Sequence, residues 1–160
     1  MAIKRNPLKT SFEANYFFHF LLICNRWFCT VAQVQVINRF HINSTGWWDY
    51  IAVNNGRVYV SHGNQLNILD AETGDSLDYI PNTNGVHGVA FDLANSKGYT
   101  SNGNSNSVTV FDLKTNKVLA TIDGVEKNPD AITFESFTKT IITCNGGSNN
   151  LSVIDLSKIR

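Results

Sequence analysis

The sequence is poor in charged residues, in proline and in long apolar runs. Charged side chains make up 16% of the 160 residues and cancel to a net charge of zero, and residues 41–160 carry eight bases against twelve acids. A body without a cluster of Lys and Arg lacks the positive surface that phosphate backbones require, so a nucleic-acid partner is not expected. No apolar run approaches the ~20 residues needed to cross a bilayer, so no membrane span is expected either.

Cysteine is equally scarce. Cys24 and Cys29 lie in the first forty residues, and their spacing lacks the second pair of ligands that a zinc site needs. Cys144 is alone in the rest of the chain, at a position where the repeat described below otherwise has Ser61 and Ser101. We therefore expect no disulfide framework in a chain that begins at residue 33, and no metal or cofactor.

The first 32 residues differ from everything that follows. Residues 1–9 are basic, residues 17–24 are apolar, and Thr30-Val31-Ala32 supplies small residues at the spacing that a signal peptidase accepts. This pattern predicts a signal peptide over residues 1–32, a mature domain over residues 33–160, and a periplasmic or secreted protein. The apolar run is interrupted at Asn25-Arg26, so an aberrant amino terminus without a signalling role is the alternative.

Asparagine and aromatic residues are abundant. Twenty asparagines favour polar turns, and eighteen aromatic residues can bury enough surface to fold, which together indicate a turn-rich β protein. From residue 46 onward three strand-like segments recur in the same order. The Asp that ends the third segment stands at Asp70, Asp112 and Asp155, at spacings of 42 and 43 residues. Such regularity indicates a structural repeat.

Each repeat unit is predicted to hold four strands. Apolar residues alternate at period two in the first three strands, and a fourth strand follows each of the turns at Asp70 and Asp112, where we expect the Asp side chain to accept backbone N–H groups. Four strands in about 42 residues is the spacing of a β-propeller blade. The expected fold is therefore all-β, a partial β-propeller of about three four-stranded blades.

The two ends of the repeat region leave this propeller incomplete. Residues 34–42 are predicted to be an outer strand placed before the first unit, and the last unit stops in the turn where its fourth strand should begin. Three blades do not close a ring, so two blade faces would expose apolar side chains. We expect a truncated or partial chain or, if the chain is complete, self-association that covers both faces.

Two motifs give the repeat a family resemblance: Tyr59-Val60-Ser61-His62 and Tyr99-Thr100-Ser101-Asn102. With the Asp and the Thr-Gly or Thr-Asn turn that follow each, they resemble the repeats of YVTN-type β-propellers, and the starts of the units resemble those of exported, YncE-like bacterial proteins. The third unit departs, with Ile142-Thr143-Cys144-Asn145. The resemblance covers residues 46–156 and implies a ring of seven blades, which needs roughly twice this length.

The candidate site lies on the propeller face where the loops into the inner strands meet the loops between the second and third strands. Polar loop residues on a rigid scaffold favour ligand binding. The candidate ligand-binding residues are Asp49, His62, His87, Asn102, Asp130 and Asn145. The other interpretation is that the asparagines are simply good hairpin residues. The two histidines do not make a zinc site, since the repeat has Asn at both positions that match His62.

No catalytic residue is assigned. The sequence has no nucleophile elbow, P-loop or dinucleotide fingerprint, and the adjacent residues Ser61 and His62 must point to opposite faces of a strand. The predicted function is that of an exported, non-enzymatic module that binds a protein or a small ligand at its loop face. Two alternatives stay open. One is a propeller enzyme or redox subunit, similar to lactonases or quinoprotein amine dehydrogenases, and the other is a truncated remnant without independent function.

Overall fold

The structure, a computed structural model, describes residues 34–158. The expected signal peptide of residues 1–32, and with it Cys24 and Cys29, lies outside these residues. The described part of the chain forms eleven strands and two short 3-10 helices, which confirms the all-β prediction. No helix in that part is long and apolar enough to cross a membrane. The compact unit that holds all eleven strands begins at Asn38.

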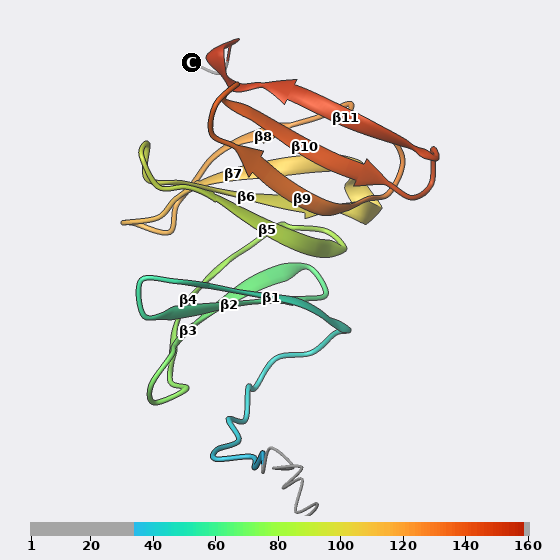
Figure 1. Cartoon of the computed structure of the whole chain (residues 1–160). Coiled ribbons are helices and arrows are strands. Elements are labelled where there is room, and N and C mark those ends of the chain that lie inside the picture. The colour runs from blue at the N-terminus through green and yellow to red at the C-terminus, as the bar shows by residue number, and fades with distance from the viewer. Residues whose placement is uncertain (1–33, 159–160) are drawn as a thin grey trace, which may run out of the picture. The chain divides into compact units, whose positions relative to one another are not determined.

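The strands form three antiparallel sheets in which consecutive strands are hydrogen-bonded neighbours (Figure 1). The first sheet contains β1 (Trp48–Asn54), β2 (Arg57–His62), β3 (Gln65–Asp70) and β4 (Ser76–Ile80). The second contains β5 (Val86–Asp92), β6 (Lys97–Asn102), β7 (Ser107–Asp112) and β8 (Val118–Ile122), with the helix η1 (Gly103–Ser105) between β6 and β7. The third contains β9 (Pro129–Glu135), β10 (Thr140–Asn145) and β11 (Asn150–Asp155). A short helix, η2 (Leu156–Lys158), follows where a fourth strand would start.

Acidic side chains organise the turns after the third strand of each four-stranded sheet. Asp70 Oδ1 accepts the backbone N–H groups two and three residues further along, at 2.9 and 2.8 Å. Asp112 Oδ1 does the same at 2.9 and 2.7 Å. Gly74 and Asn116 then reverse the chain with positive φ, at 76° and 56°. The prediction that both Asp side chains serve turns is confirmed.

The three sheets are stacked in chain order, with the inner strands β1, β5 and β9 next to one another (Figure 1). We call the side of a sheet that faces toward the amino-terminal end of the stack its leading face and the opposite side its trailing face. Each sheet joint therefore places the trailing face of one sheet on the leading face of the next. The leading face of the first sheet and the trailing face of the third have no sheet against them.

Aromatic and branched side chains fill both joints. Between the first two sheets, the buried Tyr59 ring lies 5.0 Å from the Phe91 ring and 6.2 Å from the Phe111 ring. Phe111 lies over Gly98 on the paired strand, where a Cβ atom would be 2.1 Å from the ring, so only glycine fits. In the second joint Tyr99 stacks on Phe134 at 6.3 Å. The two cores are thus built from matching repeat positions.

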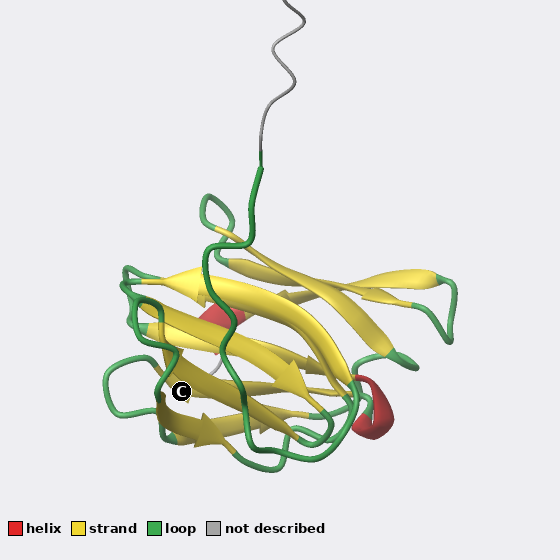
Figure 2. Ribbon diagram, turned by 90° about the horizontal axis from the view of Figure 1, so that it is seen from below, coloured by secondary structure: helices red, strands yellow, loops and turns green. Residues whose placement is uncertain are grey.

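Residues 34–42 form no strand, so the prediction of an outer strand there is wrong. From Asn38 onward the chain instead crosses the leading face of the first sheet before it enters β1 (Figure 2), where Phe40 and Ile42 lie beside Ile51 and Leu69. A strand needs a free sheet edge, and the outer edge that lacks a fourth strand, at β11, belongs to the third sheet at the opposite end of the stack. Phe40 and Ile42 contact the face of the first sheet instead.

Candidate binding site at the inner strands

Asp49, His87 and Asp130 occupy the same position, the second residue of the inner strands β1, β5 and β9. In all three sheets the pairing between the inner strand and its neighbour is irregular at this point. Such bulges break the strict alternation of a strand and re-aim side chains. The irregularity allows three equivalent polar residues from three sheets to face the inner edge of the stack, where a rigid scaffold surrounds them.

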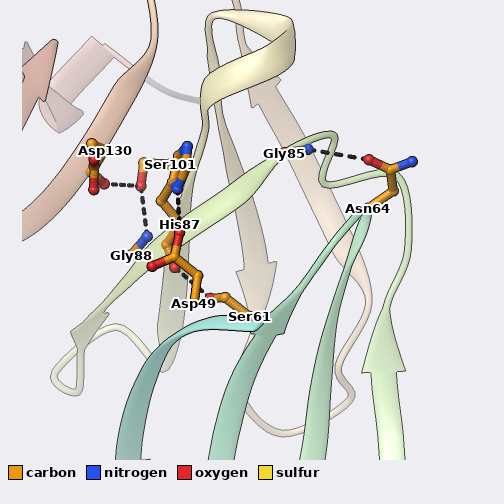
Figure 3. Close-up of polar contacts among 8 residues, drawn as sticks. All are labelled: Asp49, Ser61, Asn64, Gly85, His87, Gly88, Ser101 and Asp130. Atoms are coloured by element: carbon orange, nitrogen blue, oxygen red, sulfur yellow. Dashed lines mark hydrogen bonds and ion pairs between the residues drawn. The ribbon is translucent and has the colours of Figure 1, made fainter. Parts of the chain in front are cut away.

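His87 and Asp49 are in direct contact across the first joint. The Asp49 Oδ2 atom is paired with His87 Nδ1, and the two side chains keep 35% and 26% of their surface exposed, so solvent reaches both (Figure 3). The contact fixes the ring orientation of the histidine, and it is an ion pair whenever the imidazole is protonated. Sequence analysis placed both residues on one face, and the structure brings them together.

The other ring nitrogen of His87 is left available. Among the described residues, Nε2 has no hydrogen-bond partner. It points toward Gly103 at the start of η1, where an added Cβ would lie 2.6 Å from Nε2 and 2.4 Å from Asn128 Oδ1. Gly103 therefore provides the space in which the ring sits. An imidazole held through Nδ1 with a free Nε2 can donate to or accept from a ligand.

Asp130 contributes a second carboxylate to the same region. Its Oδ1 atom is buried and has no hydrogen-bond partner among residues 34–158. Its negative charge raises the pKa of the Tyr50 phenol above the ordinary value, which shows that Tyr50 on β1 and Asp130 on β9 lie near each other although a whole sheet separates them along the chain. The inner strands thus surround a region with two carboxylates and one imidazole.

Asn102 and Asn145 lie elsewhere, inside their sheets. Both are buried, and each amide is fully engaged within its sheet. Asn102 Oδ1 accepts from Thr100 Oγ1 at 2.8 Å, and its Nδ2 donates to Thr109 Oγ1 at 2.8 Å and Ser107 Oγ at 3.2 Å. Asn145 makes the equivalent bonds to the hydroxyls and amide of β10 and β11, at 2.9 Å each. Both asparagines hold the second and third strands together and do not face the candidate site.

His62 has a similar structural role in the first sheet. Its Nε2 donates to the Gly46 carbonyl at 2.8 Å, its Nδ1 contacts Ser44 Oγ, and its ring stacks on Trp48 at 3.7 Å with a tilt of 12°. It is almost fully buried. The structure therefore separates the six candidate residues into two groups, Asp49, His87 and Asp130 at the inner strands, and His62, Asn102 and Asn145 within the sheets.

A hollow of about 600 Å³ adjoins the His87–Asp49 pair. Trp47, which is almost fully exposed, and Trp48 line it together with both members of the pair. Further polar lining comes from Asn64, whose side chain bridges to Gly85 of the next sheet. The participation of Tyr50 and Gly103 in the site was not predicted from the sequence. Gly103 contributes only by leaving room for the His87 ring, and Tyr50 lies where the pairing of β1 is irregular. Neither property can be recognised from the periodicity or the spacing of the sequence.

Metal binding at this position has no support from the geometry. Within residues 34–158 no three His, Cys, Asp or Glu side chains lie close enough together to hold a metal ion. The chemistry available is therefore hydrogen bonding through the imidazole, negative charge from two carboxylates, and an aromatic surface.

Comparison with known proteins gives a structural likeness alone. No protein family and no curated protein matches the sequence. Among solved structures the chain is similar to hydrazine synthase of Kuenenia stuttgartiensis, with a TM-score of 0.59 and 20% sequence identity. The match covers 65% of this chain and only 30% of the hydrazine synthase chain. It supports the arrangement of antiparallel sheets and does not transfer an activity.

Proposed function

We propose that the chain forms three consecutive blades of a β-propeller of the YVTN type, similar to YncE-like proteins. The proposal is supported by the three adjacent inner strands and by two joints built from the same repeat positions. The likeness of the chain to part of hydrazine synthase also supports it. The inner strands would then line the propeller channel. Asp49, His87 and Asp130 would lie at its mouth, beside the loops of the first two blades.

The function that this geometry supports best is non-enzymatic binding of a positively charged group, such as the amine or guanidinium of a small ligand or of a partner protein. The observation that carries it is the pairing of Asp49 with His87 beside Trp47, with Asp130 close by. When His87 is neutral, the region carries the charge of two carboxylates, which attracts cations. An adjacent indole adds cation–π attraction for the same kind of group.

Titration with small cations tests the proposal. Tryptophan fluorescence should change on addition of ethylamine, guanidinium or a Lys-containing tripeptide, because Trp47 and Trp48 line the hollow. Asp49→Asn should weaken binding about tenfold or more, since a hydrogen bond to a charged group contributes roughly 1.5–3 kcal/mol. Glu72→Gln removes the same charge from an exposed turn and serves as the control. Equal binding by the two variants, or no binding at all, would contradict the proposal.

A second candidate function follows from the free Nε2 atom of His87. A histidine oriented by a carboxylate through Nδ1 is also the arrangement of a general base that activates water. This would make the chain part of a hydrolytic propeller, for example one acting on lactones or esters. Slow, pH-dependent hydrolysis of an activated ester that disappears in His87→Gln would favour it, and identical rates in both proteins would exclude it.

We also propose that the protein is exported to the periplasm or secreted, on the pattern of residues 1–32. Mass spectrometry of the protein from its native host should find a chain that begins at Gln33. Recovery of the chain with residues 1–32 still attached would refute export by cleavage.

A further inference from the structure

The two internal joints are made by the same set of polar bonds. Ser61 Oγ donates to the backbone carbonyl of His87 in the next sheet, and Ser101 Oγ donates to that of Asp130 (Figure 3). The Asn64 side chain accepts the Gly85 N–H at 3.2 Å. In the second joint, Asn106 accepts the Asn128 N–H in the same way at 2.9 Å. A serine and an asparagine on the trailing side of each sheet thus bind the inner strand of the sheet that follows.

Apolar side chains complete each joint at fixed positions on the third strand. Leu66 and Ile68 of β3 have no exposed surface, and Val108 and Val110 of β7 are 0% and 2% exposed. The matching residues of β11 are Leu151 and Val153, which are 62% and 67% exposed. The trailing face of the third sheet therefore presents the same apolar positions without a cover.

This face also has exposed residues at the two positions that make the polar bonds of the internal joints. Cys144 stands where the other sheets have Ser61 and Ser101, and Asn149 stands where they have Asn64 and Asn106. The trailing face of the third sheet therefore has the apolar and polar residues of a joint at the same repeat positions, and no other sheet of the described residues packs on it.

The leading face of the first sheet is the complementary surface. Ile51 and Val53 are 67% and 65% exposed, although their counterparts in the other inner strands pack inside the joints. The segment with Phe40 and Ile42 crosses this face but leaves a hollow of about 550 Å³ over it. The exposed residues Ile51, Val53, Leu151 and Val153 give both open faces an apolar centre, as is typical of an interface.

We propose that the trailing face of the third sheet binds the leading face of the first sheet in a second copy of the chain. The occupant follows from the two internal joints, because each already joins these two kinds of face. In the contact, Cys144 would face the Asp49 carbonyl of the second copy, and Asn149 would face the Trp47 N–H, which has no hydrogen-bond partner among the described residues. A two-fold contact between like faces would give neither side chain its acceptor or donor.

The contact is head to tail, so each copy uses both faces and two copies can close on each other. It is independent of whether an amine binds near Asp49. Sedimentation of the full-length chain should show an association that Val153→Lys or Ile51→Lys abolishes, since each places a charge in an apolar joint. Phe137→Lys, at an exposed position on the turn between β9 and β10, should leave association unchanged.

Mixing the two defective variants separates the possible geometries. Val153→Lys keeps a working leading face and Ile51→Lys keeps a working trailing face, so an equimolar mixture should form a heterodimer although each variant alone is monomeric. A monomeric wild-type chain, association that neither substitution affects, or loss of association in only one of the two variants would overturn the proposal. Circular dichroism melting of each variant establishes that it is folded.

A disulfide trap gives a readout that does not depend on affinity. In chains with Cys24→Ser and Cys29→Ser, one copy retains Cys144 and the other carries Asp49→Cys with Cys144→Ser. Mild oxidation should link unlike copies. Links between two Cys144 residues, or none between unlike copies, would contradict the head-to-tail contact.

Discussion

At the scale of single residues, acidic side chains on the surface stabilise turns by accepting backbone N–H groups. Asp70 and Asp112 do so after β3 and β7, and Glu135 accepts the N–H groups of Phe137 and Thr138 at 2.9 and 2.6 Å after β9. Hydrogen bonds of the turns favour the charged form and hold the pKa of all three carboxyls below their ordinary values of 3.8 for Asp and 4.5 for Glu. The N–H groups of Thr73 and Thr115 contribute most at Asp70 and Asp112, and the hydroxyl of Thr138 contributes most at Glu135. The three turns therefore depend on ionisation.

The sign of the pH dependence follows from these shifts. Because folding lowers the three pKa values, the stability that they add is complete above about pH 5 and is lost as the pH falls through the lowered values. The variant with Asp70→Asn, Asp112→Asn and Glu135→Gln keeps acceptor oxygens but cannot titrate. Its melting temperature should fall less between about pH 5 and pH 3 than that of the wild type.

A matched control is the pair Glu72→Gln and Asp123→Asn, which alters exposed acids whose side chains accept no backbone N–H among the described residues. This pair should melt with the pH dependence of the wild type. If the triple variant and the wild type lose stability in parallel, ionisation of these turns is not what supports the fold at acid pH.

Part of the candidate site could be predicted from the sequence. The repeat register places Asp49, His87 and Asp130 at one position of three strands, and that much is visible in the sequence. Asn102 and Asn145 occupy an equally polar position at a strand end, yet their amides turn into the sheet and bind hydroxyls two residues away. A polar side chain at the end of a strand can face the loops or turn into the sheet. Asn102 and Asn145 turn into the sheet because the hydroxyls of Thr100 and Thr143 donate hydrogen bonds to them.

At the scale of strands, the buried asparagines link the second and third strands of their sheets through side-chain hydrogen bonds. Asn102 is completely buried and bonds to three hydroxyl groups of β6 and β7. Removal of its amide leaves the hydroxyls of Thr100 and Thr109 without this partner, and each unsatisfied buried polar group costs roughly 1–3 kcal/mol. The Asn102 amide therefore contributes more to the free energy of unfolding than an ordinary hydrogen bond does.

Asn102→Ala should lower the free energy of unfolding by about 2 kcal/mol or more in urea denaturation. Asn104→Ala, two residues further along on an exposed position of η1, should change it by about 0.5 kcal/mol at most. Equal effects of the two substitutions would show that the buried hydrogen bonds do not stabilise the hairpin.

The strands themselves were predictable, because alternation at period two and the Asn, Gly and Asp residues between strands mark each of the eleven. Residues 34–42 show the limit of the same pattern. Alternating apolar residues form a strand only where a sheet edge is free, and no period in the sequence shows whether that edge is within reach. The bulges at Asp49, His87 and Asp130 escaped prediction because the pattern assumes unbroken alternation.

At the scale of the whole molecule, the sheets are held together one joint at a time. Ser101 is fully buried in the second joint, donating to the Asp130 carbonyl and accepting the Gly88 N–H at 2.9 Å. Ser61 occupies the same position in the first joint. Stability in such an arrangement is a sum of neighbouring contacts, so damage to one joint stays local.

Ser101→Ala should speed hydrogen exchange of the backbone amides in β9, β10 and β11 and leave those of β1 to β4 unchanged. Ser61→Ala should instead release the first sheet and spare the third. Mass spectrometry of exchanged peptides distinguishes these patterns. A uniform increase over all eleven strands in either variant would mean that the stack unfolds as a single cooperative unit.

The repetition of the joints has a consequence for how such a chain can change in length. Residues 86–128 present on one side the surface that the first sheet recognises, and on the other the surface that the third sheet recognises. If a duplicate of this segment were inserted after Asn128, its leading face could pack on the second sheet and its trailing face on the third sheet. Insertion or deletion of whole units therefore preserves the contacts between sheets, whereas an insertion of one residue inside a strand turns the side chains after it to the opposite face.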